Sequence, residues 1–285
     1  DPRSAAGRPG NLNDDIQAVR VEAEDTVIRG PRRLADSEAR TALPSSRSPL
    51  RAPGALPSLS VVIPVFNEAS TIRTLVHRVL ASPCASEVIL VDDGSTDGSG
   101  AILVELESLA RVRVLRHPGN RGKGAAIRTG FGVASCDVVL VQDADLEYDP
   151  ADFPKLLRPF VEAQAHVVYG SRFLRGEFAR VPLLRHYVGN RVLTFLSNLT
   201  TGLSLTDMET CYKAVRRDVL QGLRLRSERF TIEPELTAKL ARVPGVRIFE
   251  VPINYRGRVH AEGKKIGWRD GVSALWAIAR YAVAD

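Results

Sequence analysis

The segment LSVVIPVFNE, residues 59–68, opens the part of the chain in which a fold pattern is visible. It begins with a run of apolar and β-branched residues, which predicts a strand buried on both faces. The segment that follows it, residues 69–81, has apolar residues at helical spacing. A second apolar run at residues 87–93, EVILVDD, and a second helical stretch at residues 94–110 repeat this pair.

The alternation of strand and helix continues as far as residue 145. VRVLRH at 112–117 and DVVLVQDAD at 137–145 are expected strands, with a helix over 122–135 between them. Strands that alternate with helices at this spacing form βαβ units, so we expect an α/β fold with a mostly parallel, Rossmann-like sheet flanked by helices. Beyond residue 150 the expected elements are strands over 166–173 and 247–255 and helices over 184–202, 231–243 and 266–283.

Residues 1–57 differ in composition from the rest of the chain. They combine Arg, Asp, Glu, Pro, Gly and Ser, contain no aromatic residue and end in a Pro/Ser-rich stretch. Such a segment has too little apolar surface to form a core. We therefore expect a disordered extension and linker over 1–57, with a short helix around 13–24, followed by a single domain over 58–285.

The composition narrows the classes of partner. A formal net charge of +6 favours anionic partners such as phosphates or an acidic membrane surface. Nucleic-acid binding is disfavoured, because aromatic residues make up only 6% and are scattered. No apolar run of about 18 residues occurs, so no membrane span is expected. The three cysteines, Cys84, Cys136 and Cys211, lack metal-ligand spacing and are expected to be reduced thiols.

The most specific local signal is Asp143-Ala144-Asp145, which stands directly after an apolar strand. Ligands of parallel sheets bind beyond the carboxyl ends of the strands. In extended backbone, residues two apart project from the same face, so these two carboxylates would converge. Mg²⁺ or Mn²⁺ suits such hard oxygen ligands and could bridge a bound diphosphate, with Glu147 as a third candidate ligand. The alternative is a solvated acidic turn.

A second acidic pair, Asp92-Asp93, ends another apolar strand. One of the two is expected to face the cleft and to accept hydrogen bonds from a ribose or a base edge. The alternative is an Asx-type turn that leads into a helix, with Thr96 or Asp97 as the N-cap.

The first strand ends in Pro64-Val65-Phe66-Asn67-Glu68. At this junction between strand and helix, free amide donors and polar side chains could form the rim of a nucleotide pocket. Helix capping explains the same residues equally well.

The segment GNRGKG, residues 119–124, combines glycines with Lys123. Glycines such as Gly124 let backbone approach a phosphate, and the lysine supplies a point charge. Gly124 occupies the position at which a P-loop requires Ser or Thr, and Ile127 occupies the last glycine position of a dinucleotide-binding motif. Neither ATPase nor NAD chemistry is therefore indicated, and a plain turn before a helix is the alternative.

The later half of the chain carries a basic series that precedes the acidic residues Asp207 and Glu209. The series is Arg172, Arg175, Arg180, Arg185 and Arg191, of which Arg172 and Arg191 are the site candidates. Beside the expected cleft, these arginines are candidates for binding an acceptor's phosphate. A solvated basic surface is the alternative.

From Leu59 to its end, the chain resembles family 2 glycosyltransferases, and among them most closely the dolichyl- or polyprenyl-phosphate sugar synthases. The later motifs of the resemblance point to the lipid-phosphate acceptor. The matching segments, in order, are VVIPVFNE, VDDGSTDGS, HPGNRGKGAAIRTG, QDADLEYDP, GSRF, TDMETCYKAV and EGKKIGWRDG.

The resemblance implies a GT-A catalytic domain that transfers a hexose, with inversion, from UDP-glucose or GDP-mannose to a polyprenyl phosphate. It also implies an enzyme that works at the cytoplasmic face of a membrane. Arg172 and Arg191 would lie near the phosphates, and Asp145 would serve catalysis with its metal ion. Some relatives carry Gln at the position of Glu147. The residues implied for the donor are Pro64, Phe66, Asn67, Glu68, Asp92, Asp93, Lys123, Gly124, Asp143 and Ala144.

The choice of acceptor decides whether a general base is needed. A sugar hydroxyl must lose a proton to attack, whereas a phosphate oxygen is already anionic at neutral pH. With a lipid phosphate, Arg172 and Arg191 would position and neutralise the acceptor. With a soluble hydroxyl acceptor, Asp207 or Glu209 would become candidate bases. A nucleotidyltransferase is a further alternative, disfavoured because no Gly-rich loop follows the first strand.

The expected C-terminal helix, 266–283, has an apolar stripe with two tryptophans and basic residues at its near end. A stripe of this kind is typical of a helix that lies on a membrane surface. Packing on the domain's own core is the commoner alternative, and the exposure of Trp276 separates the two.

Overall fold

The structure is a computed structural model that describes residues 55–174, 184–257 and 268–283. The disordered extension expected over 1–57 lies almost entirely outside the described residues. Among the helices described, none is both long and apolar enough to cross a bilayer.

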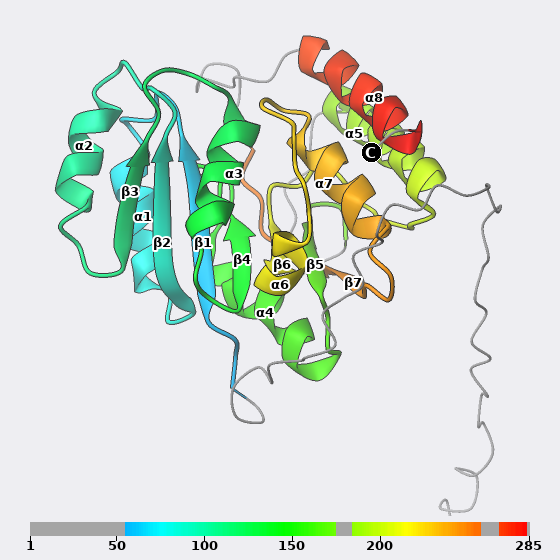
Figure 1. Ribbon diagram of the computed structural model, residues 1–285, viewed down its shortest axis with the longest axis horizontal. Helices are drawn as coiled ribbons and strands as arrows, with labels where there is room; N and C mark the ends of the chain where they lie inside the picture. The colour runs from blue at the N-terminus through cyan, green and yellow to red at the C-terminus, as the bar shows by residue number, and fades with distance from the viewer. Residues whose placement is uncertain (1–54, 175–183, 258–267, 284–285) are drawn as a thin grey trace, which may run out of the picture. The chain divides into compact units, whose positions relative to one another are not determined.

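A seven-stranded sheet forms the centre of the fold, with strand order β3-β2-β1-β4-β6-β5-β7 (Figure 1). β6 runs antiparallel to both of its neighbours, β4 and β5, and the other strand pairs are parallel. The mostly parallel sheet is therefore confirmed. The strands are β1 (Leu59–Val65), β2 (Ala85–Asp92), β3 (Val112–Arg116), β4 (Val138–Val141), β5 (Val167–Ser171), β6 (Lys213–Arg216) and β7 (Ile248–Pro252).

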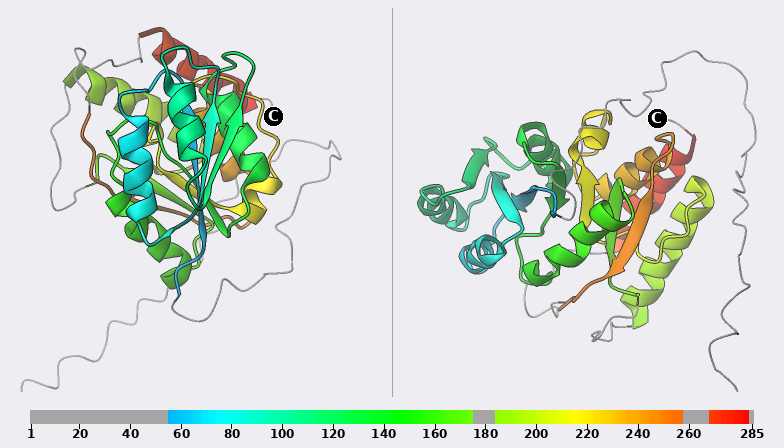
Figure 2. Two further views of the ribbon diagram at one scale, coloured as in Figure 1. Left: turned by 90° about the vertical axis from the view of Figure 1, so that its left-hand side faces the viewer. Right: turned by 90° about the horizontal axis from the view of Figure 1, so that it is seen from below.

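Helices cover both faces of this sheet, as two perpendicular views show (Figure 2). A short 3-10 helix, η1 (Pro150–Asp152), precedes α4. The α-helices are α1 (Ile72–Ala81), α2 (Ser99–Leu106), α3 (Lys123–Val133), α4 (Phe153–Glu162), α5 (Leu184–Thr201), α6 (Arg217–Gln221), α7 (Ile232–Ala241) and α8 (Trp268–Val283).

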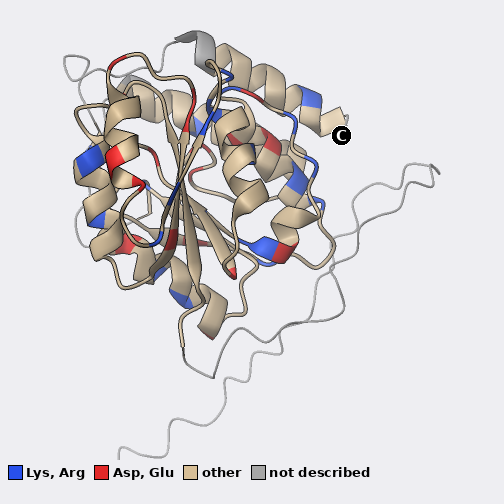
Figure 3. Cartoon of the chain, turned by 60° about the vertical axis from the view of Figure 1, so that its left-hand side comes forward, with Lys and Arg blue, Asp and Glu red and all other residues tan. Residues whose placement is uncertain are grey.

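The side-chain alternation of β1 explains why the sheet is covered on both sides. Leu59, Val61 and Ile63 pack in a core with α1, α2 and α4, whereas Val62 points into a second core with α3, α5, α7 and α8. All four side chains are fully buried. Because successive residues of a strand face opposite sides, an uninterrupted apolar run is what a two-sided burial requires. Figure 3 agrees with this two-sided burial, because the strands carry few charged residues.

Two elements near the site were absent from the sequence expectation, α4 and β6. β6 comprises only Lys213–Arg216 and begins with a buried lysine, so a charge interrupts the short apolar stretch in which it lies. The short α4 carries two prolines, Pro154 and Pro159. β6 is set by its pairing between β4 and β5, whereas α4 buries Phe153, Leu156, Leu157 and Phe160 at helical spacing, a local signal that the sequence expectation missed.

Candidate active site

Asp143 and Asp145 lie just beyond the carboxyl end of β4, as the sequence predicts. Lys123, the first residue of α3, places its Nζ 2.8 Å from Asp143 Oδ1 and 3.0 Å from Glu233 Oε1 on α7. Burial alone would raise the pKa of Asp143, but the Lys123 ammonium outweighs it and lowers that pKa below its usual value. Asp143 is therefore held as a carboxylate.

The other two metal-ligand candidates, Asp145 and Glu147, accept hydrogen bonds from within the protein. Asp145 Oδ1 accepts a hydrogen bond from the backbone N–H of Glu147 at 3.0 Å. The Tyr255 hydroxyl donates to Glu147 Oε2 at 2.6 Å. Both contacts order the acidic turn that follows β4.

Within the described residues, no three acidic, histidine or cysteine side chains converge into a ready-made metal site. The donor chemistry nevertheless fits Mg²⁺ or Mn²⁺, which take hard carboxylate oxygens and commonly complete their coordination with phosphate and water. Asp143 and Asp145 would therefore supply part of a coordination sphere, and a bound diphosphate would supply more of it.

Asp93 organises the loop that leads to Lys123. Its Oδ1 accepts the backbone N–H of Arg121 at 3.0 Å and lies 2.7 Å from His117 Nδ1, and its Oδ2 accepts the N–H of Gly122 at 2.7 Å. Asp92 accepts the N–H of Ser95 at 2.9 Å, which is the turn contact that the alternative interpretation of this pair requires. Asp93 thus ties the end of β2 to the start of α3.

The segment after β1 contacts the segments after β2 and β4. Asn67, at a positive φ of 53°, accepts the N–H of Thr96 on its Oδ1 at 2.8 Å. The Thr71 hydroxyl lies 2.9 Å from Glu68 Oε2 and 2.9 Å from the Ala144 carbonyl oxygen. Capping does not account for Asn67 and Glu68, because α1 begins after Thr71 without a side-chain cap. Pro64 and Phe66 are both half-buried beside this segment.

Gly122 and Gly124, on either side of Lys123, must be glycines because the backbone of a segment more than 100 residues further along the chain lies against them. A Cβ on Gly122 would lie 2.4 Å from the Glu228 carbonyl oxygen, and one on Gly124 would lie 2.5 Å from that of Ser227. The same segment accepts a hydrogen bond from the N–H of Ala125 at 3.0 Å, on the Glu228 carbonyl. The close approach of residues 227–229 therefore positions the start of α3.

We expect Gly124→Ala to destabilise the fold by about 1–3 kcal/mol, because its Cβ would push into backbone that cannot yield cheaply. The matched control is Gly132→Ala on the same helix, where an added Cβ meets nothing within 4 Å. That change should be neutral or stabilise by up to about 1 kcal/mol through helix propensity. Urea unfolding measures both, and equal effects would contradict the steric explanation.

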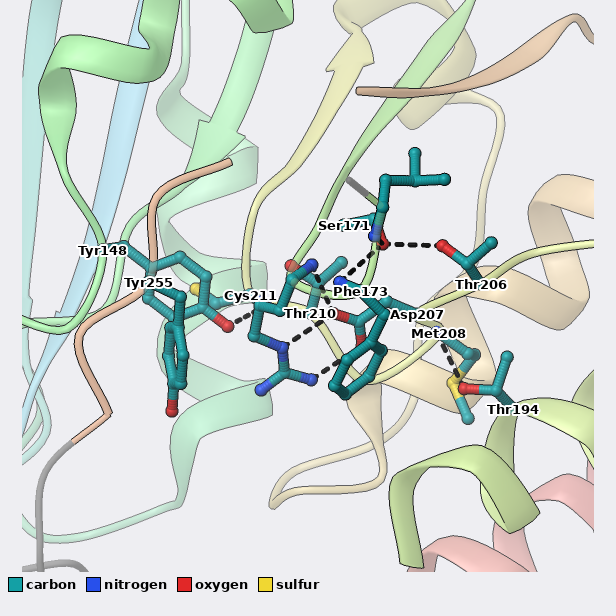
Figure 4. Close-up of polar contacts among 12 residues, drawn as sticks. Tyr148, Ser171, Phe173, Thr194, Thr206, Asp207, Met208, Thr210, Cys211 and Tyr255 are labelled. Carbon is teal, nitrogen blue, oxygen red and sulfur yellow. Dashed lines mark hydrogen bonds and ion pairs between the residues drawn. The ribbon is translucent and has the colours of Figure 1, made fainter. Parts of the chain in front are cut away.

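Arg172 and Asp207 form a buried, bidentate ion pair at the end of β5 (Figure 4). Nε and Nη2 of Arg172 donate to the two carboxylate oxygens of Asp207, each at 2.7 Å, and the Arg172 backbone N–H donates at 3.0 Å. The guanidinium also lies 5.2 Å from the ring centre of Tyr255. Because both oxygens of Asp207 are occupied, a role as general base is disfavoured.

Arg191 approaches the same loop from α5. It is exposed, and its Nη1 donates to the Thr206 carbonyl at 3.3 Å. Arg175 and Arg180 of the basic series lie outside the described residues. The structure therefore brings the two arginines of the acceptor hypothesis to one loop, residues 206–207.

Residues 60–224 of the chain match the family described as glycosyl transferase family 2. The chain belongs to this family. It is 35% identical to undecaprenyl-phosphate 4-deoxy-4-formamido-L-arabinose transferase of Edwardsiella ictaluri, over 72% of this chain and 62% of that protein. It is 33% identical to polyprenol monophosphomannose synthase of Mycolicibacterium smegmatis, over 73% of this chain and 80% of that protein.

Solved structures of similar fold include glucosyl-3-phosphoglycerate synthase from Mycobacterium tuberculosis in complex with Mn²⁺, UDP and glucosyl-3-phosphoglycerate. The TM-score is 0.59 at 20% identity, over 80% of this chain and 81% of that one. The predictions of a GT-A fold and of a family 2 glycosyltransferase are confirmed. The chain spans about three fifths of the length of several relatives, 62% of the arabinose transferase and 61% of the dodecaprenyl-phosphate galacturonate synthase of Rhizobium johnstonii.

Sequence reasoning did not identify four polar residues that the fold places at the site. Glu250 of β7 accepts the backbone N–H of Thr206 at 2.9 Å and so holds the loop that carries Asp207. A charged residue inside an apolar run was the available signal for Lys213 and Glu250. No local signal marks the remaining two, whose roles depend on partners distant in sequence. The four are Lys213, Glu233, Glu250 and Tyr255.

Glu209 is a site carboxyl whose pKa is shifted into the neutral range. Burial, together with the negative charge of Glu233, raises its pKa to about 7, although Lys213 opposes the shift. Its Oε1 is buried and has no hydrogen-bond partner among the described residues. A neutral Glu209 is therefore favoured in the folded protein below pH 7.

Because the folded-state pKa of Glu209 lies above its usual value, the folded protein binds the proton more tightly than the unfolded chain. Stability is then lost as the pH rises from about 4.5 to about 7. We expect Glu209→Gln to match the wild type near pH 4.5 and to be more stable by about 1–3 kcal/mol above pH 7. Urea unfolding in EDTA tests this, and a pH-independent difference would contradict it.

Proposed function

We propose that this chain transfers a hexose, with inversion at the sugar carbon, from UDP-glucose or GDP-mannose to a polyprenyl phosphate. The observation that carries the proposal is the position of Arg172. Its guanidinium lies 5.2 Å from the ring centre of Tyr255, whose hydroxyl donates to Glu147 Oε2 at 2.6 Å in the acidic turn after β4. A cationic group for an acceptor phosphate thus neighbours the carboxylates for a donor diphosphate. Relatives named for undecaprenyl, dodecaprenyl and polyprenol acceptors support the same acceptor class.

On the donor side, Asp143 and Asp145 would hold Mg²⁺ or Mn²⁺, with Glu147 as a further ligand. Such an ion, when bound, neutralises the charge that develops on the leaving diphosphate. Lys123 adds a cation at the start of α3, beside Asp143. The nucleotide would lie on the polar rim after β1 and β2, formed by Pro64, Phe66, Asn67, Glu68, Asp92 and Asp93.

On the acceptor side, a phosphate oxygen attacks without giving up a proton. Arg172 and Arg191 would bind and orient the phosphate, and the bidentate pair with Asp207 fixes the guanidinium of Arg172. Asp207 accordingly serves as a positioning residue in this scheme. Glu209, the remaining candidate base, is held largely neutral below pH 7, which suits a reaction without a base.

The protein is proposed to act at a membrane surface, on the cytoplasmic face. α5 and α8 pack against each other, and each exposes an apolar stripe at helical spacing. Trp276 is 58% exposed, the outcome that favours a membrane-surface helix over a helix buried in the core. Exposed apolar area of this kind marks an interaction surface. The stripes are Leu184, Val188, Val192, Phe195 and Leu199 on α5, and Val272, Leu275, Trp276 and Val283 on α8.

The test is a transfer assay with UDP-glucose or GDP-mannose, Mg²⁺ or Mn²⁺, and a short polyprenyl phosphate. We expect one of the donors to give a labelled, organic-extractable product that depends on both the lipid and the metal. Water-soluble product instead would move the acceptor to a soluble molecule. No turnover and no binding of either donor would overturn the proposal.

For the membrane contact, we expect Trp276→Glu to weaken binding to anionic phospholipid vesicles about tenfold in co-sedimentation. Val104→Glu is the matched control, because Val104 is 60% exposed but lies on α2, away from the two stripes. Equal loss in both variants would contradict a specific surface.

A further inference from the structure

Lys123 joins a metal-ligand candidate to an acidic residue that no motif contains. Its ammonium lies between Asp143 and Glu233, at 2.8 Å and 3.0 Å from their carboxylate oxygens. The three side chains are 16%, 24% and 9% exposed, so solvent screens their charges little. Three separate elements, α3, the turn after β4, and α7, supply these groups.

Glu233 has capacity for a further contact. Its Oε1 pairs with Lys123, whereas its Oε2 is buried without a hydrogen-bond partner in the described structure. A buried carboxylate oxygen without a donor favours an adjacent cation.

An ammonium and a divalent cation that contact the same carboxylate repel each other, so each weakens the binding of the other. If a metal ion binds Asp143, as the proposed function requires, Lys123 loses part of its stabilisation there. Glu233 then remains as its second partner, already in contact and with a free oxygen. The arrangement therefore has two cations competing for Asp143 and one carboxylate that can retain the displaced lysine.

We propose that Lys123 and Glu233 form a counter-ion switch for Asp143. Lys123 neutralises Asp143 when no divalent cation is present, and Glu233 retains Lys123 when a cation takes that carboxylate. Lys123 and Glu233 are thus positioning residues that set the affinity for the metal before the donor binds. The inference rests on the proposed metal site at Asp143 and Asp145.

The switch predicts opposite effects from two neighbouring substitutions. Lys123→Met removes the competing cation, so Mn²⁺ should bind about tenfold more tightly. Glu233→Gln leaves Lys123 with Asp143 as its carboxylate partner, so Mn²⁺ should bind about tenfold more weakly. In the double variant the competing cation is absent, so the effect of Glu233→Gln should shrink to threefold or less.

The experiment measures free Mn²⁺ by electron paramagnetic resonance on the full chain, without a donor. Asp145→Asn identifies the binding that occurs at the site. Lys155→Met is the control for the loss of a lysine ion pair elsewhere, since Lys155 on α4 pairs with Asp152 and not with Asp143 or Glu233. Thermal unfolding shows whether each variant is folded, and Lys123→Arg, which keeps the charge, provides a second folded variant that should retain wild-type affinity within threefold.

The possible outcomes separate the two proposals. Affinities that move in opposite directions support the switch. A second outcome is that Mn²⁺ binding is lost in Asp145→Asn, while the affinities of Lys123→Met and Glu233→Gln change in the same direction or do not change. This outcome overturns the switch but supports the metal site. No Mn²⁺ binding that depends on Asp145 overturns both.

Discussion

Asp145→Asn should lower the rate constant of sugar transfer about a thousandfold, the largest effect we expect from one substitution. Asp145 follows β4 two residues after Asp143, and its carboxylate orders the turn through the backbone N–H of Glu147. The amide keeps the size and one acceptor oxygen of the side chain but removes the charge that, under the proposed function, would hold a divalent ion. The fold should therefore survive while the leaving diphosphate loses its neutralisation.

The measurement is the initial rate of lipid product formation at saturating donor and Mn²⁺. Asp149→Asn is the matched control, four residues further on, where the carboxylate accepts the N–H of Ala151 at the start of η1. This control should keep at least half of the activity. An Asp145→Asn protein that retains more than a tenth of the wild-type rate would remove this residue from the catalytic machinery.

The second large effect concerns the buried pair of Arg172 and Asp207. Asp207 is completely buried, and its ion pair with Arg172 occupies both carboxylate oxygens. Arg172→Met would leave a buried carboxylate without its cation, which costs about 3–5 kcal/mol. In contrast, Arg158→Met should cost less than about 1 kcal/mol, because Arg158 and Glu162 are 72% and 57% exposed.

Urea unfolding of both variants tests the stability prediction, and the double variant with Asp207→Asn should recover part of the loss. The activity prediction uses Arg172→Lys, which keeps the charge but loses the planar fork. Its kcat/KM for polyprenyl phosphate should fall about a hundredfold, with donor affinity unchanged. If instead donor affinity falls and the lipid parameters are unchanged, Arg172 belongs to the donor side of the site.

The sequence was most informative where burial is two-sided. The runs in β1, β2 and β4 could be predicted because a central strand covered on both faces must be apolar along its length. The same reasoning located the acidic residues, since chemistry in a parallel sheet lies beyond the strand ends. Asp92, Asp93, Asp143 and Asp145 are all found there. The helix over 184–202 was also predictable, and the structure places it at Leu184–Thr201.

The amino-acid pattern is enough to predict the layered α/β sheet, the edge at which polar residues gather and the motifs of the family. Which of those residues meet depends on the packing of distant elements. That packing inserted the antiparallel β6, placed residues 227–229 against Gly122 and Gly124, and paired Arg172 with Asp207 across 35 positions of sequence. Local periodicity reports which face of an element is buried, whereas the partner of a buried charge depends on packing between distant elements. For that reason Lys123 could be predicted as a cation, but its place between Asp143 and Glu233 could be learned only from the fold.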